Sequence, residues 1–267
     1  MILDMSAVQP IKLDLGAQFK FRCYPGIKCF TKCCSRINIL LTPYDIIRMK
    51  NRLGISSEEF LDKYTYLHID EKSSFPYAML RMRKDEENLC PFVTPEGCTI
   101  YTDRPASCRY YPIGQGILIK EGEKRPVNEE FYFIVRERHC DGFEEEKEWT
   151  IESWRADQEV DLYDEMNREW KEVQLMRNIY GKRELDPKKQ AQLYMAGYDI
   201  DKFKRFVFES KFLDIFDIPK EERERIETDE LALMKLAVKY IKYILMVEET
   251  LQLKKEIKEA KMKEEKK

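Results

Sequence analysis

Apolar residues return at helical spacing through the second half of the chain. In "WRADQEVDLYDEMNREWKEVQLM" and "DKFKRFVFESKFLDIF" they recur every three or four positions, which places them on one face of a helix. Pro187 and Pro219 stand where helices can begin, because proline fits the first helical turn. Five aromatic positions are expected in the core: Phe203, Phe206, Phe208, Phe212 and Phe216. The pattern predicts a helical region over residues 149–267 that ends in a charged tail.

The first half alternates shorter helices and strands. The segment "TPYDIIRMKNRLG" has Thr42 as an N-cap, Pro43 at the first helical position and Gly54 as a stop. A second helix begins at Ser56 or Ser57 in "SSEEFLDKY". The segments "PYAMLRMRK", "GILIK" and "FYFIVRE" are typical of strands, and the polar turn "EGEKRP" joins the last two.

These patterns predict an α+β fold in two domains. A small cysteine-rich domain of short strands and helices takes residues 1–148, and an all-α region takes residues 149–267. No proline- or glycine-rich linker separates the two, so the helices are expected to pack directly on the cysteine-bearing half.

Composition and charge narrow the classes of partner. The 267 residues are 43% hydrophobic and 12% aromatic, enough for a sizeable core. Basic and acidic residues number 47 and 50, so no basic field attracts nucleic acid. The N-terminus lacks the basic start and apolar run of a signal peptide. Lysines interrupt the most apolar late segment, "LALMKLAVKYIKYILMV", which predicts a packed amphipathic helix. We expect a cytoplasmic protein with neither nucleic acid nor membrane as a partner.

Sulfur is concentrated in the first half of the chain, which holds every cysteine: Cys23, Cys29, Cys33, Cys34, Cys90, Cys98, Cys108 and Cys140. Disulfides are uncommon in a reducing cytosol. We therefore interpret these cysteines first as metal ligands and second as redox or catalytic thiols. The high lysine and glutamate content also suits a thermophilic source, where intracellular disulfides occur, which keeps disulfides as an alternative.

The spacing of the cysteines suits a convergent site. Loops need not follow a helical or strand period, and thiolates favour zinc and iron–sulfur clusters. Cys33 and Cys34 are adjacent, so either a special turn directs both side chains inward or they have different tasks. Prolines and Gly97 frame a second cysteine group, Cys90, Cys98 and Cys108, with rigid turns. Eight sulfurs could serve two four-ligand sites, or one site with spectators.

Three segments stand out: "CYPGIKCFTKCC", "INILLTPYDIIRMKNRLG" and above all "GCTIYTDRPASCRYYPIG". They resemble the YkgJ-type CxxCxxCC cysteine-cluster proteins, which are described as zinc- or iron-chelating. The resemblance covers roughly residues 20–145, and "MAGYDIDKFKRFVFESKFL" looks like the carboxyl-terminal extension of longer members. It implies a metal site built from these thiolates. The family name implies two residues between cysteines, whereas five separate Cys23 from Cys29, so the place of Cys23 in the site stays open.

Flagellin lysine N-methylase is similar to this family in its cysteine cluster, which raises the alternative of a protein-modifying enzyme. The chain has no G-x-G-x-x-G between a strand and a helix. Its nearest fragment, "IGQGI" around Gly114 and Gly116, is predicted to be a turn into the strand "GILIK". Whether the protein is an enzyme stays open.

Few groups beside the cysteines could take part in chemistry. His68 and His139 are the only histidines, so a catalytic Cys–His pair must use one of them, although ordinary surface or core histidines are the alternative. The other titratable neighbours are Asp103 and three tyrosines, and none of them forms a recognised catalytic pattern. The tyrosines are Tyr101, Tyr110 and Tyr111.

Arg104 and Arg109 flank Cys108. The resemblance makes them part of the family signature and candidate cofactor-binding residues, which could hydrogen-bond cluster sulfurs. The alternative is a structural pair with Asp103 or another carboxylate.

The sequence as a whole predicts a metal-binding cysteine-cluster protein. An iron–sulfur cluster, [4Fe–4S] being one form, is favoured over zinc because zinc sites usually have tidy pairs of short spacings. The alternatives are a zinc-stabilised protein-interaction module without catalysis and a methyltransferase-like or redox enzyme. A protein partner or protein substrate fits each of them, and the oligomeric state is unknown. A shared site requires Cys33 or Cys34 to lie near Cys98 and Cys108.

Overall fold

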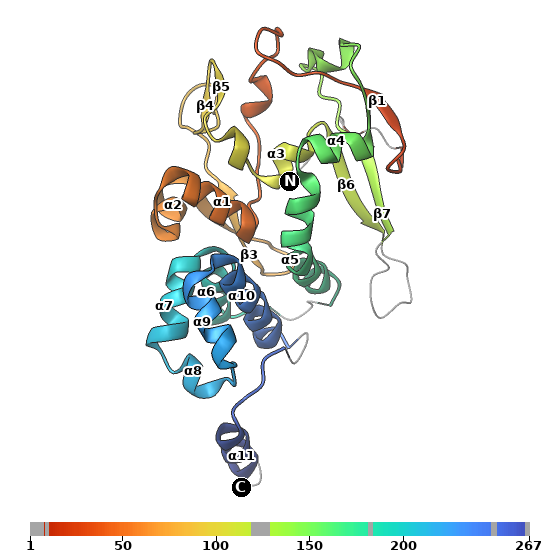
Figure 1. Ribbon diagram of the computed structural model, residues 1–267. Coiled ribbons are helices and arrows are strands. Elements are labelled where there is room, and N and C mark those ends of the chain that lie inside the picture. Colours follow the sequence, from red (N-terminus) through yellow and green to blue (C-terminus); the bar gives the residue numbers. More distant parts are fainter. Residues whose placement is uncertain (1–7, 9–10, 119–128, 181–183, 247–249, 265–267) are drawn as a thin grey trace. The chain divides into compact units, whose positions relative to one another are not determined.

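The computed structural model describes residues 8, 11–118, 129–180, 184–246 and 250–264 (Figure 1). The chain forms two compact units, and each is built from two separate stretches: Met1–Leu40 with Leu80–Glu165, and Leu41–Met79 with Met166–Lys267. The domain boundary predicted after residue 148 falls inside the first unit.

The first unit consists of small antiparallel pairs of strands joined by short helical turns. In one pair Phe19 lies opposite Trp149, and in another Ile113 lies opposite Ile134. The paired strands are β1 (Gln18–Lys20) with β8 (Glu148–Thr150), β4 (Val93–Thr94) with β5 (Gly97–Cys98), and β6 (Ile113–Leu118) with β7 (Glu129–Ile134). The helical elements are η2 (Lys32–Cys34), η3 (Tyr101–Asp103), α3 (Ala106–Tyr110), η4 (Asp141–Glu144) and α4 (Ile151–Asp157).

Aromatic rings fill the core of the first unit. The Phe21 ring meets the rings of Trp154, Phe143 and Tyr111 edge to face, at centroid distances of 5.5, 5.1 and 6.1 Å. Edge-to-face contacts of this kind fix ring orientation as well as burying area. Phe21 lies two residues before Cys23, so this cluster anchors the start of the first cysteine loop.

The fragment "IGQGI" is part of β6, and the turn predicted there is wrong. A Cβ on Gly114 or Gly116 would lie 2.3 Å from the ring of Phe133 or Phe131 on the paired strand. The two rings occupy the space that a side chain at Gly114 or Gly116 would need. The glycines are therefore explained by packing between the strands and not by a turn. The predicted turn "EGEKRP" and the last two residues of "GILIK" lie outside the described residues.

The second unit is mainly helical, which confirms the predicted α+β class with a helical C-terminal region. Its helices from the first stretch are α1 (Pro43–Leu53) and α2 (Ser57–Tyr64), followed by the paired strands β2 (Thr65–Ile69) and β3 (Pro76–Leu80). Its later helices are α5 (Val160–Tyr180), α6 (Pro187–Tyr198), α7 (Ile200–Glu209), α8 (Phe212–Ile215), α9 (Lys220–Thr228), α10 (Glu230–Ile244) and α11 (Lys255–Glu264). The first turns of α5 and the last residue of β3 belong to the first unit.

Local signals set the helix ends as predicted. The Thr42 side chain and Asp45 form a reciprocal capping box at the start of α1, and Gly54 ends that helix at φ 67°. Pro187 is the first residue of α6, after the N-cap Asp186. These ends depend on residues next to one another in the chain, which is why the sequence predicts them.

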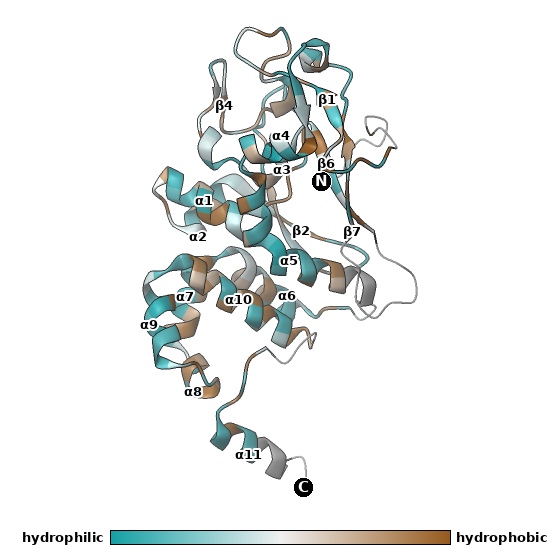
Figure 2. Ribbon diagram, turned by 45° about the vertical axis from the view of Figure 1, so that its right-hand side comes forward, coloured by the Kyte–Doolittle hydropathy of each residue, from teal (hydrophilic) through white to brown (hydrophobic). Residues whose placement is uncertain are grey.

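The grouping of α1 and α2 with the later helices was not predicted. Helix α1 contacts α6 and α10, and the buried Lys50 ammonium lies 2.5 Å from the Glu230 carboxylate at the start of α10. In Figure 2, α8 is largely brown and α9 largely teal, and the predicted core residues Phe203, Phe212 and Phe216 are buried. Among the described residues, no helix combines the length and hydrophobicity needed to cross a membrane.

Candidate metal centre

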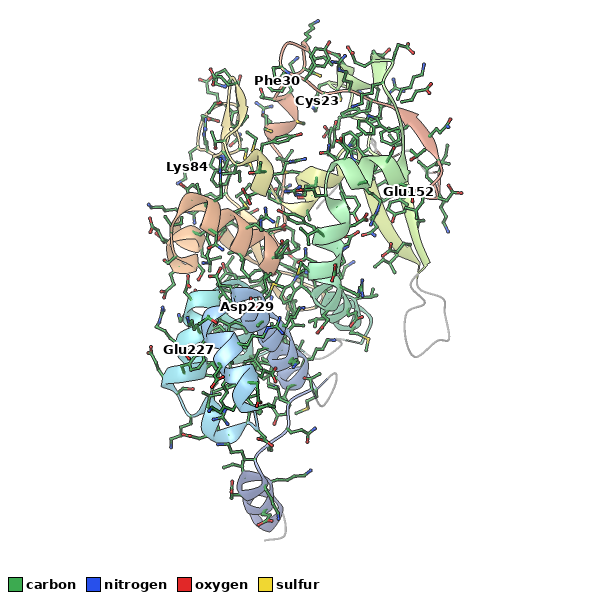
Figure 3. All side chains as sticks on the ribbon, viewed as in Figure 1. Cys23, Phe30, Lys84, Glu152, Glu227 and Asp229 are labelled. Atoms are coloured by element: carbon green, nitrogen blue, oxygen red, sulfur yellow. The ribbon has the colours of Figure 1, made fainter. Side chains whose placement is uncertain are left out.

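The first cysteine loop winds through successive tight turns. Backbone hydrogen bonds run from Phe30 N–H to the Ile27 carbonyl, from Lys32 N–H to the Cys29 carbonyl and from Cys34 N–H to the Thr31 carbonyl, at 2.9–3.0 Å. Thr31 has φ 66°, a left-handed conformation that reverses the chain. Figure 3 labels Cys23 and Phe30 on this loop. The turns keep the thiols of a short stretch close together.

A second turn, at residues 140–142, closes on this loop. The backbone N–H of Asp141 donates to the Cys29 sulfur at 3.2 Å, and Arg22 N–H donates to the Gly142 carbonyl at 3.0 Å. A Cβ on Gly142 would lie 2.7 Å from the Phe21 ring and 3.0 Å from the Arg22 carbonyl. Only glycine fits this approach, which places Cys140 beside the first cysteine loop.

Two thiols of this region, those of Cys23 and Cys140, each interact electrostatically with the thiols of Cys29 and Cys33. Burial raises the pKa of Cys23 to about 11, and the other three thiols add to that shift. Burial also raises the pKa of Cys140, with Cys29 and Cys33 contributing. The environment of Cys23 and Cys140 disfavours negative charge unless a cation is present.

The second cysteine group also contacts this loop. Cys90 N–H donates to the Cys34 carbonyl at 2.7 Å, and the Phe30 ring packs against Gly97, which has φ 126°. Burial raises the pKa of Cys90 to about 11, with contributions from Cys98 and Cys33. Cys33 is thus an electrostatic neighbour of both groups.

Cys108 lies on α3. Burial lowers the pKa of Arg104, and the nearby thiols of Cys108 and Cys98 oppose that shift. Arg104 therefore interacts electrostatically with both sulfurs. Such proximity is a requirement for donating a hydrogen bond to either of them.

The thiols lie in neighbouring segments but do not form a coordination sphere. All eight cysteines are free thiols. Across the described residues, no group of three or more cysteine, histidine, aspartate or glutamate side chains is close enough to hold a metal ion. A metal with Zn–S bonds of about 2.3 Å would have to draw the sulfurs inward.

Arg109 makes its hydrogen bonds to oxygen. Its guanidinium is 1% exposed and donates to the backbone carbonyls of Thr102 and Gln158 at 2.5 and 2.8 Å, and to that of Arg104 at 3.2 Å. It also lies over the Tyr163 ring, 4.2 Å from the centroid. These contacts join α3 to η3 and to the start of α5, which is a structural role.

The histidines lie at the surface of their units. His139 is exposed, with its Nε2 3.3 Å from the Glu137 carboxylate. His68 is exposed on β2 in the second unit. Neither has the buried, oriented setting of a catalytic base.

Two features of the site were not predicted from the sequence. The Asp141 N–H and the glycine contact of residue 142 are backbone features, and their only sequence signal is the glycine that follows "CD" in "RHCDG". The second feature is the Tyr111 hydroxyl oxygen, which is buried and has no hydrogen-bond partner of standard geometry. An orphaned donor of this kind fits a site that holds charged sulfur when loaded.

Comparison with known proteins agrees with this chemistry. Residues 22–147 match the model of the CxxCxxCC family, whose description is "Putative zinc- or iron-chelating domain". No curated protein and no solved structure matches the chain. The matched segment holds all eight cysteines and both turns described above. Over residues 22–147 the chain is therefore similar to the CxxCxxCC family, whose members are described as zinc- or iron-chelating.

Proposed function

We propose that the protein binds a metal centre through four thiolates, those of Cys23, Cys29, Cys33 and Cys140. The observation that carries this proposal is the hydrogen bond from Asp141 N–H to the Cys29 sulfur. A neutral thiol is a weak acceptor, whereas a metal-bound thiolate is charged and accepts strongly. The turn that supplies this donor also supplies Cys140 as a ligand.

The environment of the sulfurs supports a bound cation. Burial raises the pKa of Cys23 and of Cys140, so the thiols keep their protons at neutral pH when no metal is present. A bound cation reverses this preference, because a coordinating thiol is deprotonated outright. Metal binding at this site therefore releases protons, and acid should release the metal.

An iron–sulfur cluster is the form we favour, with zinc as the alternative. Cluster potentials are set by hydrogen bonds to sulfur and by burial, and both features occur around Cys29 and Cys140. Such a site would serve structure or electron storage. The cytoplasm is a suitable compartment, since thiolate ligands need reducing surroundings.

Metal analysis tests this proposal directly. We expect protein purified without oxygen to contain iron and acid-labile sulfide, with the brown colour of a cluster. Zinc without sulfide would identify a zinc site instead. Protein that holds neither metal after reconstitution would refute the proposed function.

The ligand set needs a separate test. Replacing Cys29 or Cys140 by Ser should abolish stoichiometric metal binding, whereas Cys90→Ser and Cys98→Ser should keep it. Loss of metal in Cys90→Ser would contradict the four-ligand assignment and point to a larger site around Cys33.

A zinc-stabilised interaction module is the second candidate function. It is favoured by the exposed Tyr101 ring, 58% exposed, which stacks with Arg104 at 3.9 Å close to the second cysteine group. A protein partner could recognise such a pair. Purified protein with zinc and no redox-active iron would favour this alternative.

A further inference from the structure

Strand β2 lies at the end of its sheet. It pairs with β3 in a two-stranded sheet, and the connection over residues 70–75 is too short for a parallel crossover. The pair is therefore an antiparallel hairpin, and the Asp70 N–H donates to the Phe75 carbonyl at its base, at 3.0 Å. The Leu41 N–H donates to the Ala78 carbonyl at 2.9 Å, which engages β3 from its other edge.

The register of the hairpin determines which backbone groups of β2 point outward. In an antiparallel pair each residue directs its N–H and its carbonyl to the same side, and successive residues alternate. Counting back from Asp70, which bonds across the hairpin, the even-numbered residues of β2 face β3, whereas Leu67 and Ile69 face away. Among the described residues, none outside the hairpin forms a hydrogen bond with Leu67 or Ile69. Their N–H and carbonyl groups therefore make an open strand edge.

The side chains along this edge are exposed and include no lysine, arginine or carboxylate. Tyr66 is 42% exposed and Leu67 is 54% exposed, and His68 is exposed as well. Edge strands are ordinarily protected by charged side chains, proline or a bulge, because open backbone groups attract another strand. The five residues Thr65–Ile69 contain no charged side chain of this kind, no proline and no glycine. The edge is therefore suited to pairing with a further strand.

The charges at the two ends of β2 are complementary to a second copy of the same edge. Asp62 and Lys63 lie in the last turn of α2, directly before the strand, and Glu71 and Lys72 follow it in a turn. In an antiparallel pair centred on Leu67, Lys63 of one copy adjoins Glu71 of the other. Asp62 adjoins Lys72 in the same way. A partner strand with ends of a single charge would meet its own sign at both ends, whereas a second copy meets the opposite sign.

We propose that two copies of this chain associate through β2, whose outer edges pair antiparallel about a two-fold axis. Leu67 exchanges both backbone hydrogen bonds with the same residue of the other copy, and each Ile69 N–H donates to the Thr65 carbonyl across the axis. Thr65 contributes only its carbonyl, because its N–H already bonds to the Leu61 carbonyl. Strand β2 belongs to the second unit and the proposed metal ligands to the first, so this inference does not depend on the proposed function.

Sedimentation of the full chain, as isolated and over a range of concentrations, tests the association. We expect a monomer–dimer equilibrium in the wild type. Leu67→Lys should give a monomer, because it places like charges directly opposite each other. Leu15→Lys is the matched control, since Leu15 is 45% exposed and lies in the first unit. This control should associate as the wild type does.

Exchanging the charges at the strand ends tests the antiparallel register. Lys63→Glu and Glu71→Lys each place like charges at both ends of the pair, and each should weaken association about 10-fold. Mixing the two variants should restore association, because each supplies the sign that the other lacks. The double variant Lys63→Glu/Glu71→Lys should associate as the wild type does.

Hydrogen exchange distinguishes a second copy from other occupants of the edge. The amides of Leu67 and Ile69 should gain protection as the protein concentration rises. Constant protection in a monomer would mean that another segment of the same chain covers the edge, and this result would overturn the inference. A wild type that stays monomeric with open amides would also overturn it, as would a dimer that survives Leu67→Lys or a mixture of the charge variants that stays dissociated.

Discussion

At the residue scale, the absence of one side chain allows the Cys140 turn to meet the first cysteine loop. Gly142 lies where a Cβ would be 2.7 Å from the Phe21 ring and 3.0 Å from the Arg22 carbonyl. A backbone oxygen cannot move aside as a flexible side chain can. The position therefore controls whether Asp141 and Cys140 reach the thiols.

We expect Gly142→Ala to displace this turn. The strain should lower the free energy of unfolding by ~1–3 kcal/mol, as overpacking does, and reduce the metal content because Cys140 moves away. Gly16→Ala is the matched control, since a Cβ there meets only the Asp14 carboxylate at an ordinary 3.6 Å. Melting curves and metal analysis measure both effects, and equal metal content in the two variants would contradict the expectation.

Asp199 gives a prediction for pH dependence in the second unit. Burial raises its pKa, while its carboxylate accepts from the Ser57 hydroxyl at 2.6 Å and from Lys202 N–H at 3.2 Å. A folded-state pKa above the unfolded value of about 3.9 favours the protonated, folded form. This contribution to stability is complete below that unfolded value and is lost as the pH rises through the folded pKa.

Asp199→Asn should remove this pH dependence, because the amide oxygen can accept the same bonds without charge. Asp199→Ala should cost about 1 kcal/mol at neutral pH through the lost helix cap. Urea unfolding from about pH 4, near the unfolded pKa, to neutrality measures both variants. A pH slope in Asp199→Asn equal to that of the wild type would show that another group carries the dependence.

At the element scale, the break between α4 and α5 is a feature that the hydrophobic pattern of the sequence does not predict. Helical spacing continues through "WRADQEVDLYDEMNREWKEVQLM", yet α4 ends at Asp157 and Glu159 has φ 54°. The Gln158 carbonyl accepts from Arg109 at 2.8 Å, a contact 49 positions away in the chain. The capped ends of α1 and α6 were predictable because their signals are local, whereas this break depends on a distant guanidinium.

Arg109 should therefore be needed for the fold of the first unit. Arg109→Lys keeps the charge but cannot reach three carbonyls at once, and we expect a loss of ~3 kcal/mol in unfolding free energy from the carbonyls left unpaired. Arg136→Lys is the control, because its partner Glu144 is exposed and such pairs contribute ~0–1 kcal/mol. An Arg109→Lys variant as stable as the control would show that the carbonyl contacts contribute little.

The contact between α1 and α10 gives a second prediction at this scale. The Lys50 side chain is 6% exposed and lies 2.5 Å from the Glu230 carboxylate, which is 35% exposed. Removing the partner of a buried charge costs up to ~3–5 kcal/mol, and the partial exposure of Glu230 reduces that figure. Glu230→Ala should lower the urea midpoint clearly. Glu224→Ala, which removes an exposed pair with Lys220, should leave it nearly unchanged.

At the scale of the whole molecule, the grouping of residues 41–79 with the helices changes what metal removal should do. If the site couples to folding, chelation should speed hydrogen exchange in the first unit. Helices α1 and α2 should stay protected, because they belong to the second unit. Loosening of residues 43–64 together with the cysteine loops would support the continuous domain 1–148 predicted from sequence.

The candidate site was predictable in composition and only partly in geometry. Cysteine spacing indicated metal chemistry, and the signature around Cys108 indicated the family. Sequence could not rank the eight thiols, because the turn at residues 140–142 and the Phe30 contact with Gly97 decide which sulfurs approach Cys33. Both are tertiary contacts between segments more than 60 residues apart.

The discontinuous build of the two units also sets an order of events during synthesis. Residues 23–34 leave the ribosome more than 100 positions before Cys140, so their thiols meet the cell's metal pool without the last proposed ligand. Helices α1 and α2 likewise emerge before α6 and α10, the helices that α1 contacts. A fragment cut after residue 148 would lack Ile151 and Trp154 from the first core and leave α1 without its partners. Expression of the cysteine region alone should therefore begin from residues 1–165 with residues 41–79 replaced by a short linker, a design that keeps one unit whole.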